Sequence, residues 1–257
     1  RLGLHLTAPP IRATCTPWQP HAAALLDALG LRDRVQPWPY TRQPAGPALA
    51  VSRATFDCAH PFERNYQRGF WHVRKLRERL RAAFRLPPPA AASAGPRLLL
   101  VIDRNGCAAR SVSEGGCDAS RAVAGQAAIV QAMRAAFGAA DRVVEFSGRE
   151  PLSEQASLFA RAALVVGPHG AALANTLFCA DGTPVVEYHR QHWRKEPNSP
   201  LYALLSRQLG LVHWAVVDRE RGAREYAGIR PDEVVATAHA ALQGTARACE
   251  SCGVEIG

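Results

Sequence analysis

The residues best suited to bind an anion are Gly167-Pro168-His169-Gly170-Ala171. The apolar run before them, Ala163–Val166, predicts a buried strand, and Ala171–Phe178 predicts a helix directly after the turn. The two glycines let the backbone approach a ligand closely. A helix N-terminus adds N–H groups and partial positive charge. This pattern predicts a diphosphate site in which His169 donates to a phosphate or a sugar hydroxyl, although a tight turn with His169 capping the backbone has the same spacing.

The turn differs from two common nucleotide-binding motifs. The chain has no G-x-x-x-x-G-K-[ST] phosphate loop, which disfavours ATP or GTP hydrolysis. It also has no G-x-G-x-x-G, so a nicotinamide cofactor is not indicated. No D-x-D motif occurs either, so the sequence does not require a bound divalent metal.

Short apolar runs alternate with helical patterns from about residue 97. The strands and helices that this alternation predicts must position the glycine–histidine turn. Strands are predicted at Leu98–Ile102, Arg142–Phe146, Ala163–Val166, Pro184–Glu187 and Leu211–Val217. Helices are predicted at Ser120–Phe137, Ser153–Ala162 with Ser153 as N-cap, Ala171–Phe178, Pro200–Leu209 and Pro231–Leu242. The alternation predicts an α/β fold with a doubly wound parallel sheet.

Ligands of such sheets bind beyond the carboxyl ends of the strands. This rule selects four segments that follow predicted strands. They are Asp103-Arg104, Ser147-Gly148, the glycine–histidine turn and Glu187-Tyr188-His189.

The first part of the chain has less regular patterns. A short helix is predicted at His21–Leu29, ending at Gly30, and an amphipathic basic helix at Phe70–Phe84. The basic helix fits packing with a solvated face, and contact with nucleic acid or a membrane is the alternative. Leu86–Pro96 is the best linker, so we expect a partial N-terminal domain over 1–90, a Rossmann-like domain over 97–243 and a tail over 244–257.

Charge and cysteine content restrict the partners only weakly. The net charge of +9 favours anionic partners, yet nearly all basic residues are arginine in a chain rich in Ala and Pro, a bias that genome composition can produce. The seven cysteines leave at least one thiol unpaired within the chain; Cys107 and Cys117 are suited to a local disulfide, and Cys249 and Cys252 lack the second pair of a zinc motif. No apolar run approaches membrane-spanning length, and because residue 1 is not Met we expect a fragment whose membrane anchor, if any, lies upstream.

The turn and its surroundings resemble the signature of glycosyltransferase family 61. The resemblance is carried by Gly167 to Asn175, Leu177-Phe178 and Gly182-Thr183-Pro184-Val185-Val186-Glu187. Upstream, Leu99 to Arg104 and Arg110 to Glu114 resemble the strand and paired arginines of that family, and Ser153-Glu154-Gln155 resembles the helix before the turn. The similarity covers about residues 97–217. One position departs, since Ser113 stands where the family usually has Asn.

The resemblance implies a GT-B-like fold of two Rossmann-type domains and residence in the endoplasmic reticulum or Golgi lumen. It implies inverting transfer of xylose, arabinose or N-acetylglucosamine from a UDP-sugar to a glycan or protein hydroxyl. Arg104 and Arg110 would counter the diphosphate charge, because guanidinium groups stay charged and bind bidentately. Gly167, Gly170, Ala171 and His169 would complete that site, Glu187 would accept from the ribose hydroxyls, and Gln155 would face the nucleotide.

An inverting transfer also needs a general base, for which Asp57, His60 and Glu63 are weak candidates. No cofactor is expected besides the UDP-sugar donor. Two other hypotheses remain. One is a degenerate, non-catalytic protein on the same fold that binds nucleotide or glycan, which the Ser113 departure motivates. The other is a basic nucleic-acid-binding protein, for which the chain lacks a recognisable motif.

Overall fold

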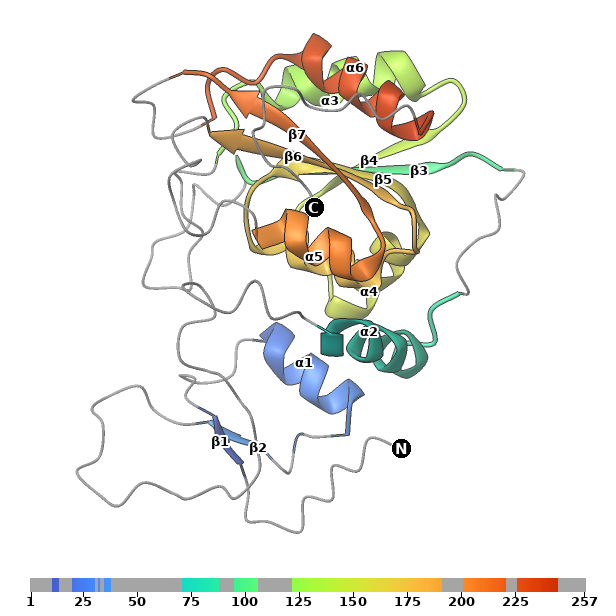
Figure 1. The fold of residues 1–257 in the computed structure, drawn as a ribbon, viewed down its shortest axis with the longest axis vertical. Coiled ribbons are helices and arrows are strands. Elements are labelled where there is room, and N and C mark those ends of the chain that lie inside the picture. The colour runs from blue at the N-terminus through green and yellow to red at the C-terminus, as the bar shows by residue number, and fades with distance from the viewer. Residues whose placement is uncertain are drawn as a thin grey trace, which may run out of the picture.

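A computed structural model of the chain describes residues 11–13, 20–30, 32, 35–37, 71–87, 95–105, 122–190, 201–220 and 226–244. Its centre is a sheet of five parallel strands (Figure 1). They are β3 (Leu98–Ile102), β4 (Arg142–Phe146), β5 (Ala162–Pro168), β6 (Pro184–Arg190) and β7 (Val212–Asp218). The spatial order is β4-β3-β5-β6-β7. This confirms the predicted α/β class and is consistent with a GT-B-like glycosyltransferase fold.

Helices cover both faces of this sheet, as a doubly wound fold requires. Helices α3 (Gln126–Phe137) and α6 (Pro231–Leu242) lie on one face (Figure 1). The other face is covered by α4 (Leu152–Arg161), the 3-10 helix η6 (Ala171–Phe178) and α5 (Leu201–Leu209). Successive residues of β3 alternate between the two apolar cores: Leu100 joins the α4 and α5 side, whereas Leu99 and Val101 join the α3 and α6 side.

In the described part of the chain, four elements precede the sheet. Strands β1 (Ile11–Ala13) and β2 (Val35–Pro37) form a parallel pair, and α1 (Pro20–Ala28) connects them. Helix α2 (Trp71–Ala83) lies against the α4 and α5 side of the sheet, where Leu80 is buried in the same core. The predicted boundary near residue 90 assigns α2 to the N-terminal domain, yet in the structure it packs on the unit that contains the five-stranded sheet.

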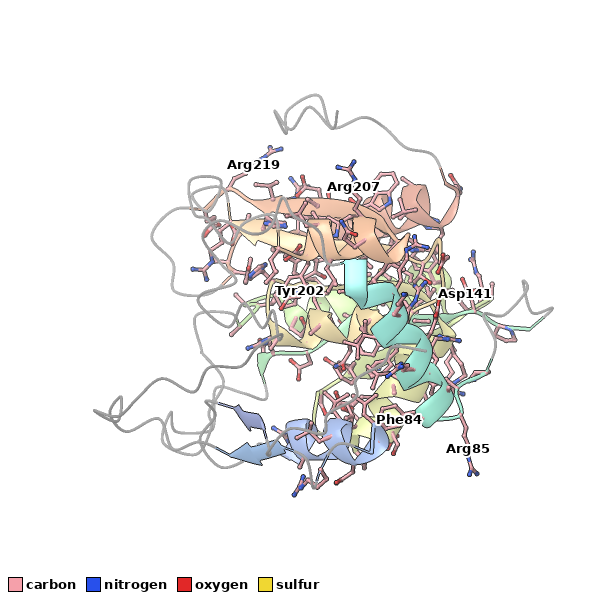
Figure 2. The ribbon with its side chains drawn as sticks, turned by 60° about the horizontal axis from the view of Figure 1, so that its bottom comes forward. Phe84, Arg85, Asp141, Tyr202, Arg207 and Arg219 are labelled. Carbon is pink, nitrogen blue, oxygen red and sulfur yellow. The ribbon has the colours of Figure 1, made fainter. Side chains whose placement is uncertain are left out.

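The chain turns sharply after α2. Arg85 has a φ of 51°, the left-handed conformation that often ends helices, and Leu86 N–H donates to the Arg81 carbonyl. The Arg85 side chain points away from the fold (Figure 2). The described part of the predicted linker therefore begins as a helix cap.

Several predicted bounds were wrong. Helix α3 begins at Gln126, not Ser120, because Val123 forms a β-bridge with Tyr226. Helix α4 begins at Leu152 with Pro151 as N-cap, so Ser153 lies inside the helix and does not cap it. Strand β6 does not end at Glu187 but continues to Arg190, because it pairs with β7 over that whole length.

Candidate functional site

The order of the strands creates a switch point at the carboxyl edge of the sheet, where a ligand crevice is expected. The chain leaves β3 toward β4 on one side and leaves β5 toward β6 on the other. The connections that leave the adjacent strands β3 and β5 therefore run in opposite directions. Such a place is a topological switch point, and open α/β sheets bind their ligands there. The crevice between the carboxyl ends of β3 and β5 is therefore the candidate site.

The segments after β3 and β5 bring two predicted site residues to this crevice. Val101 pairs with Val166, so Arg104 and His169 each stand three residues beyond a paired position on adjacent parallel strands. Arg104 is mostly buried, with 9% of its surface exposed. Asn105 fixes the same loop, because its side-chain amide accepts from and donates to the backbone of Val123 at 2.8 Å each.

The glycine–histidine turn is anchored more firmly than a loose phosphate loop. A Cβ on Gly167 would lie 2.5 Å from the Ile102 Cβ, so this glycine is needed for close packing of β5 on β3. The His169 N–H donates to the Tyr188 carbonyl at 3.3 Å and is thus engaged by β6. Ala171 is exposed at the start of η6, so the predicted helix is present and is of the 3-10 type.

Glu187 lies at the centre of a buried cluster of three histidines. Its side chain has no exposed surface, because β6 carries it under the helices instead of ending at the ligand edge. The Glu187 Oε1 is 2.5 Å from Nδ1 of His169. The Glu187 Oε2 is 2.9 Å from Nε2 of His189 and 3.0 Å from Nε2 of His213. Both carboxylate oxygens therefore face imidazole rings and not a ribose.

The histidines also set the ionisation of this carboxyl group. Burial alone would raise the pKa of Glu187, but the contacts with His169, His189 and His213 hold it well below its usual range. Glu187 is therefore a carboxylate at neutral pH, and it fixes the Nδ1–H form of the His169 ring. His169 can then contact a donor only through Nε2. Among the described residues, Glu187, His189 and His213 have ligand atoms close enough to hold a metal ion.

Gln155, predicted to face the nucleotide, lies inside the protein. It is 3% exposed on α4. Its amide nitrogen donates to the Glu150 carbonyl at 2.7 Å and to the Gly148 carbonyl at 3.3 Å, while its oxygen accepts from Asn175 at 2.9 Å. The side chain thus joins the loop after β4 to η6, and its amide is used in supporting the crevice.

The remaining predicted residues cannot be placed. Arg110, Ser113, Asp57, His60 and Glu63 lie outside the described residues. No structural statement is therefore made about the second arginine or the general base.

Comparison with known proteins identifies the family of the chain. The family described as Glycosyltransferase 61 matches residues 12–186, more than half of the chain. The chain belongs to glycosyltransferase family 61. The matched region contains Arg104 and the glycine–histidine turn, and it ends one residue before Glu187. A search of curated proteins found no match to this family 61 chain.

Sequence reasoning missed three residues of the family 61 chain on β6 and β7. His213 was assigned only to a strand, and His189 was noted only as part of a loop. Arg190 is 7% exposed at the end of β6, with its guanidinium 4.8 Å from the centre of the Tyr226 ring. The signal that was available is the alternation Glu187-x-His189, which places both side chains on one face of a strand.

Proposed function

We propose that this family 61 member is an inverting glycosyltransferase that uses a UDP-sugar and binds the donor diphosphate in the crevice between β3 and β5. The observation that carries the proposal is the switch point, from which the Arg104 loop and the His169 turn leave side by side. A mostly buried arginine supports it, because a guanidinium shielded from water interacts strongly with phosphate oxygens. The negative charge that develops on the leaving UDP would be stabilised there.

In this proposal Arg104 and Arg110 compensate the diphosphate charge, and the donor site itself needs no metal ion. His169 would contact the donor through Nε2, with Glu187 holding the ring from Nδ1. Glu187 would therefore position His169 and not bind the ribose. Gly167, Gly170 and Ala171 would shape the backbone beside the phosphates, and Gln155 would hold the supporting loop.

The donor sugar would be xylose, arabinose or N-acetylglucosamine, and the acceptor a glycan or protein hydroxyl. Asp57, His60 and Glu63 stay the candidates for the general base. We propose residence in the endoplasmic reticulum or Golgi lumen on family grounds. No helix among the described residues is long and apolar enough to cross a bilayer.

Titration calorimetry with UDP tests the site. We expect Arg104→Ala to weaken UDP binding about 10–100-fold, because it removes charge-assisted hydrogen bonds to phosphate, and His169→Ala to weaken it as well. Arg219→Ala is the matched control: Arg219 is an exposed arginine just beyond β7, at the same edge of the sheet but away from the switch point. Equal UDP affinity in the wild type, Arg104→Ala and His169→Ala would refute the site.

Release of UDP from UDP-xylose, UDP-arabinose and UDP-N-acetylglucosamine, with glycan acceptors, tests catalysis separately. Release from one donor that depends on acceptor identifies the substrate. UDP binding without release from any donor would favour the non-catalytic alternative.

A further inference from the structure

We propose that Glu187, His189 and His213 form a binding site for a first-row divalent transition-metal ion, with zinc as the expected occupant. The donors are the Glu187 Oε2, the His189 Nε2 and the His213 Nε2, which all lie within 4.8 Å of one another. The three ligand atoms differ from those proposed to contact the sugar donor, although Glu187 also holds the His169 ring through its other oxygen. The sequence did not require a metal ion at all.

The spacing of the donor atoms fits one coordination shell. Zinc binds histidine nitrogen and carboxylate oxygen at about 2.0–2.2 Å, so two ligands of one ion lie roughly 3–3.5 Å apart. The Glu187 Oε2 is 2.9 Å from the His189 Nε2 and 3.0 Å from the His213 Nε2. The three atoms are thus already gathered around one point.

Hydrogen bonding does not account for these short distances. The Glu187 Oε2 and the His213 Nε2 are both buried and have no hydrogen-bond partner, although they are 3.0 Å apart. The His213 Nε2 is therefore not aligned for a hydrogen bond to the carboxylate. A buried carboxylate oxygen left unsatisfied is costly. An ion bound between the two atoms would satisfy both.

The His213 ring and the Glu187 carboxylate are each oriented by a hydrogen bond at the atom that does not face the ion, as metal ligands usually are. The His213 Nδ1 is 3.2 Å from the hydroxyl of Ser206 on α5, a residue with 1% of its surface exposed. Donation from Nδ1–H to this hydroxyl leaves a lone pair on Nε2 for the ion. The Glu187 Oε1 accepts from the His169 Nδ1 at 2.5 Å, which orients the carboxylate.

The donor set indicates the kind of ion. Two imidazole nitrogens and one carboxylate oxygen suit zinc and its first-row neighbours and do not suit calcium or magnesium, which prefer oxygen ligands. The side chains of His189 and His213 are 15% and 14% exposed, so the site is buried but not sealed. The ion would join β6 to β7 and, through Ser206 and His169, to α5 and the glycine–histidine turn.

The test is metal binding by the full chain, without any sugar donor. After incubation with Zn²⁺ and dialysis, we expect one equivalent of zinc by elemental analysis. A free Zn²⁺ concentration about 100-fold above the Kd should raise the Tm by about 5–10 °C. His189→Gln and His213→Gln should weaken binding by more than the about 10–100-fold expected for Ser206→Ala, which removes only an outer contact.

His239→Gln is the matched control, because His239 lies on α6 against Phe137, on the opposite face of the sheet. It should retain the full equivalent of zinc. Circular dichroism of each variant checks folding, and if one histidine variant does not fold, the other and Ser206→Ala carry the comparison.

Co²⁺ substitution separates this site from the seven cysteines of the chain. The proposed ligands contain no sulfur, so the cobalt spectrum should lack a thiolate charge-transfer band. Three outcomes would overturn the proposal: no retained zinc in the wild type, full zinc binding in both His189→Gln and His213→Gln, or a thiolate band that disappears in a Cys249→Ser, Cys252→Ser variant. A wild-type protein that retains zinc but does not bind UDP would count against the donor site alone.

Discussion

At the scale of single residues, two buried carboxylates hold neighbouring strands in different ways. Glu187 is surrounded by histidines within the sheet. Asp141 stands just before β4, where its two oxygens accept from the Arg97 guanidinium at 2.7 and 2.8 Å. Arg97 precedes β3, so this pair fixes the register at the amino edge of the sheet. The Asp141 side chain is 3% exposed, whereas the Arg97 side chain is 46% exposed, so solvent reaches the pair from the Arg97 side.

The Arg97–Asp141 pair gives a prediction about acid stability. The hydrogen bonds from Arg97 hold the pKa of Asp141 below its usual value, although burial works the other way. The unfolded chain therefore takes up a proton at a higher pH than the native one. The stabilisation is present above about pH 4 and is lost as the pH falls through the lowered pKa.

We expect Asp141→Asn to lower the unfolding free energy at pH 7 by about 1–2 kcal/mol, because the half-exposed Arg97 lets solvent screen the pair. The difference from the wild type should shrink between pH 5 and pH 2, because a protonated Asp resembles Asn. Urea unfolding at a series of pH values measures it. Asp232→Asn is the control: its partner Arg230 and Asp232 itself are both largely exposed, so little change is expected. A difference as large at pH 2.5 as at pH 7 would contradict this account.

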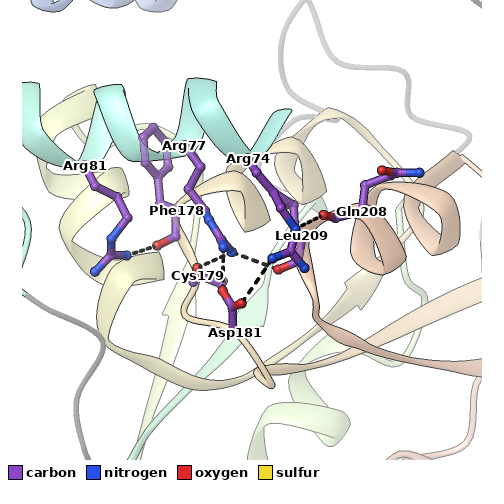
Figure 3. A network of polar contacts seen from close by, with 8 residues as sticks. All are labelled: Arg74, Arg77, Arg81, Phe178, Cys179, Asp181, Gln208 and Leu209. Carbon is purple, nitrogen blue, oxygen red and sulfur yellow. Dashed lines mark hydrogen bonds and ion pairs between the residues drawn. The ribbon is translucent and has the colours of Figure 1, made fainter. Parts of the chain in front are cut away.

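At the scale of elements, α2 is attached to the sheet unit by arginines along one of its faces (Figure 3). The Arg81 guanidinium donates to the Phe178 carbonyl at the end of η6, and Arg77 donates to the Leu209 carbonyl at the end of α5. Arg77 also pairs with Asp181. Carbonyls at helix C-termini lack hydrogen-bond donors within the helix. The arginines supply these hydrogen bonds, and their positive charge also interacts favourably with the helix dipole. The basic residues of α2 are thus used in packing.

Arg77→Met should therefore destabilise the protein by about 2–4 kcal/mol, because two buried carbonyls lose their donor. Arg74→Met is matched in chemistry and lies one turn earlier on α2. Arg74 also donates to a carbonyl, that of Gln208, and lies near Asp181, but its side chain is 52% exposed. We expect less than about 1 kcal/mol for Arg74→Met. Denaturant unfolding measures both variants. Equal losses of unfolding free energy in Arg77→Met and Arg74→Met would contradict this interpretation.

Local patterns were enough to predict most of the elements. The bounds of β3, β4, η6 and α6 match the prediction, since apolar runs and helix-ending glycines are local signals. The residues around Glu187 were not predictable in this way. The length of β6 depends on pairing with β7, and His213 lies 26 positions from Glu187 in sequence. The hydrogen bonds of Gln155 with Asn175 and with the loop after β4 are also tertiary contacts, which local patterns do not predict.

At the scale of the whole molecule, the two faces of the sheet are covered by different parts of the sequence. The face beneath α3 and α6 is closed by residues that follow β3 in sequence. The opposite face needs help from earlier residues, because Leu80, Val73 and Phe84 of the α2 region pack beside α4 and α5. Figure 2 shows Tyr202 of α5 in this layer, and its ring lies 5.0 Å from that of His169. The candidate site and α2 therefore share one apolar core.

This arrangement predicts that the folding unit built around the five-stranded sheet begins with α2 and not after the linker. A fragment covering residues 95–257 should be less stable than one covering 71–257 by about 3 kcal/mol or more, because it exposes the surface that Leu80 and its neighbours cover. The longer fragment keeps α2 and its arginine contacts. Urea unfolding of both fragments, together with binding of a hydrophobic dye, measures the difference. Equal stability and equal dye binding would instead support a domain boundary near residue 90, with α2 belonging to the N-terminal part.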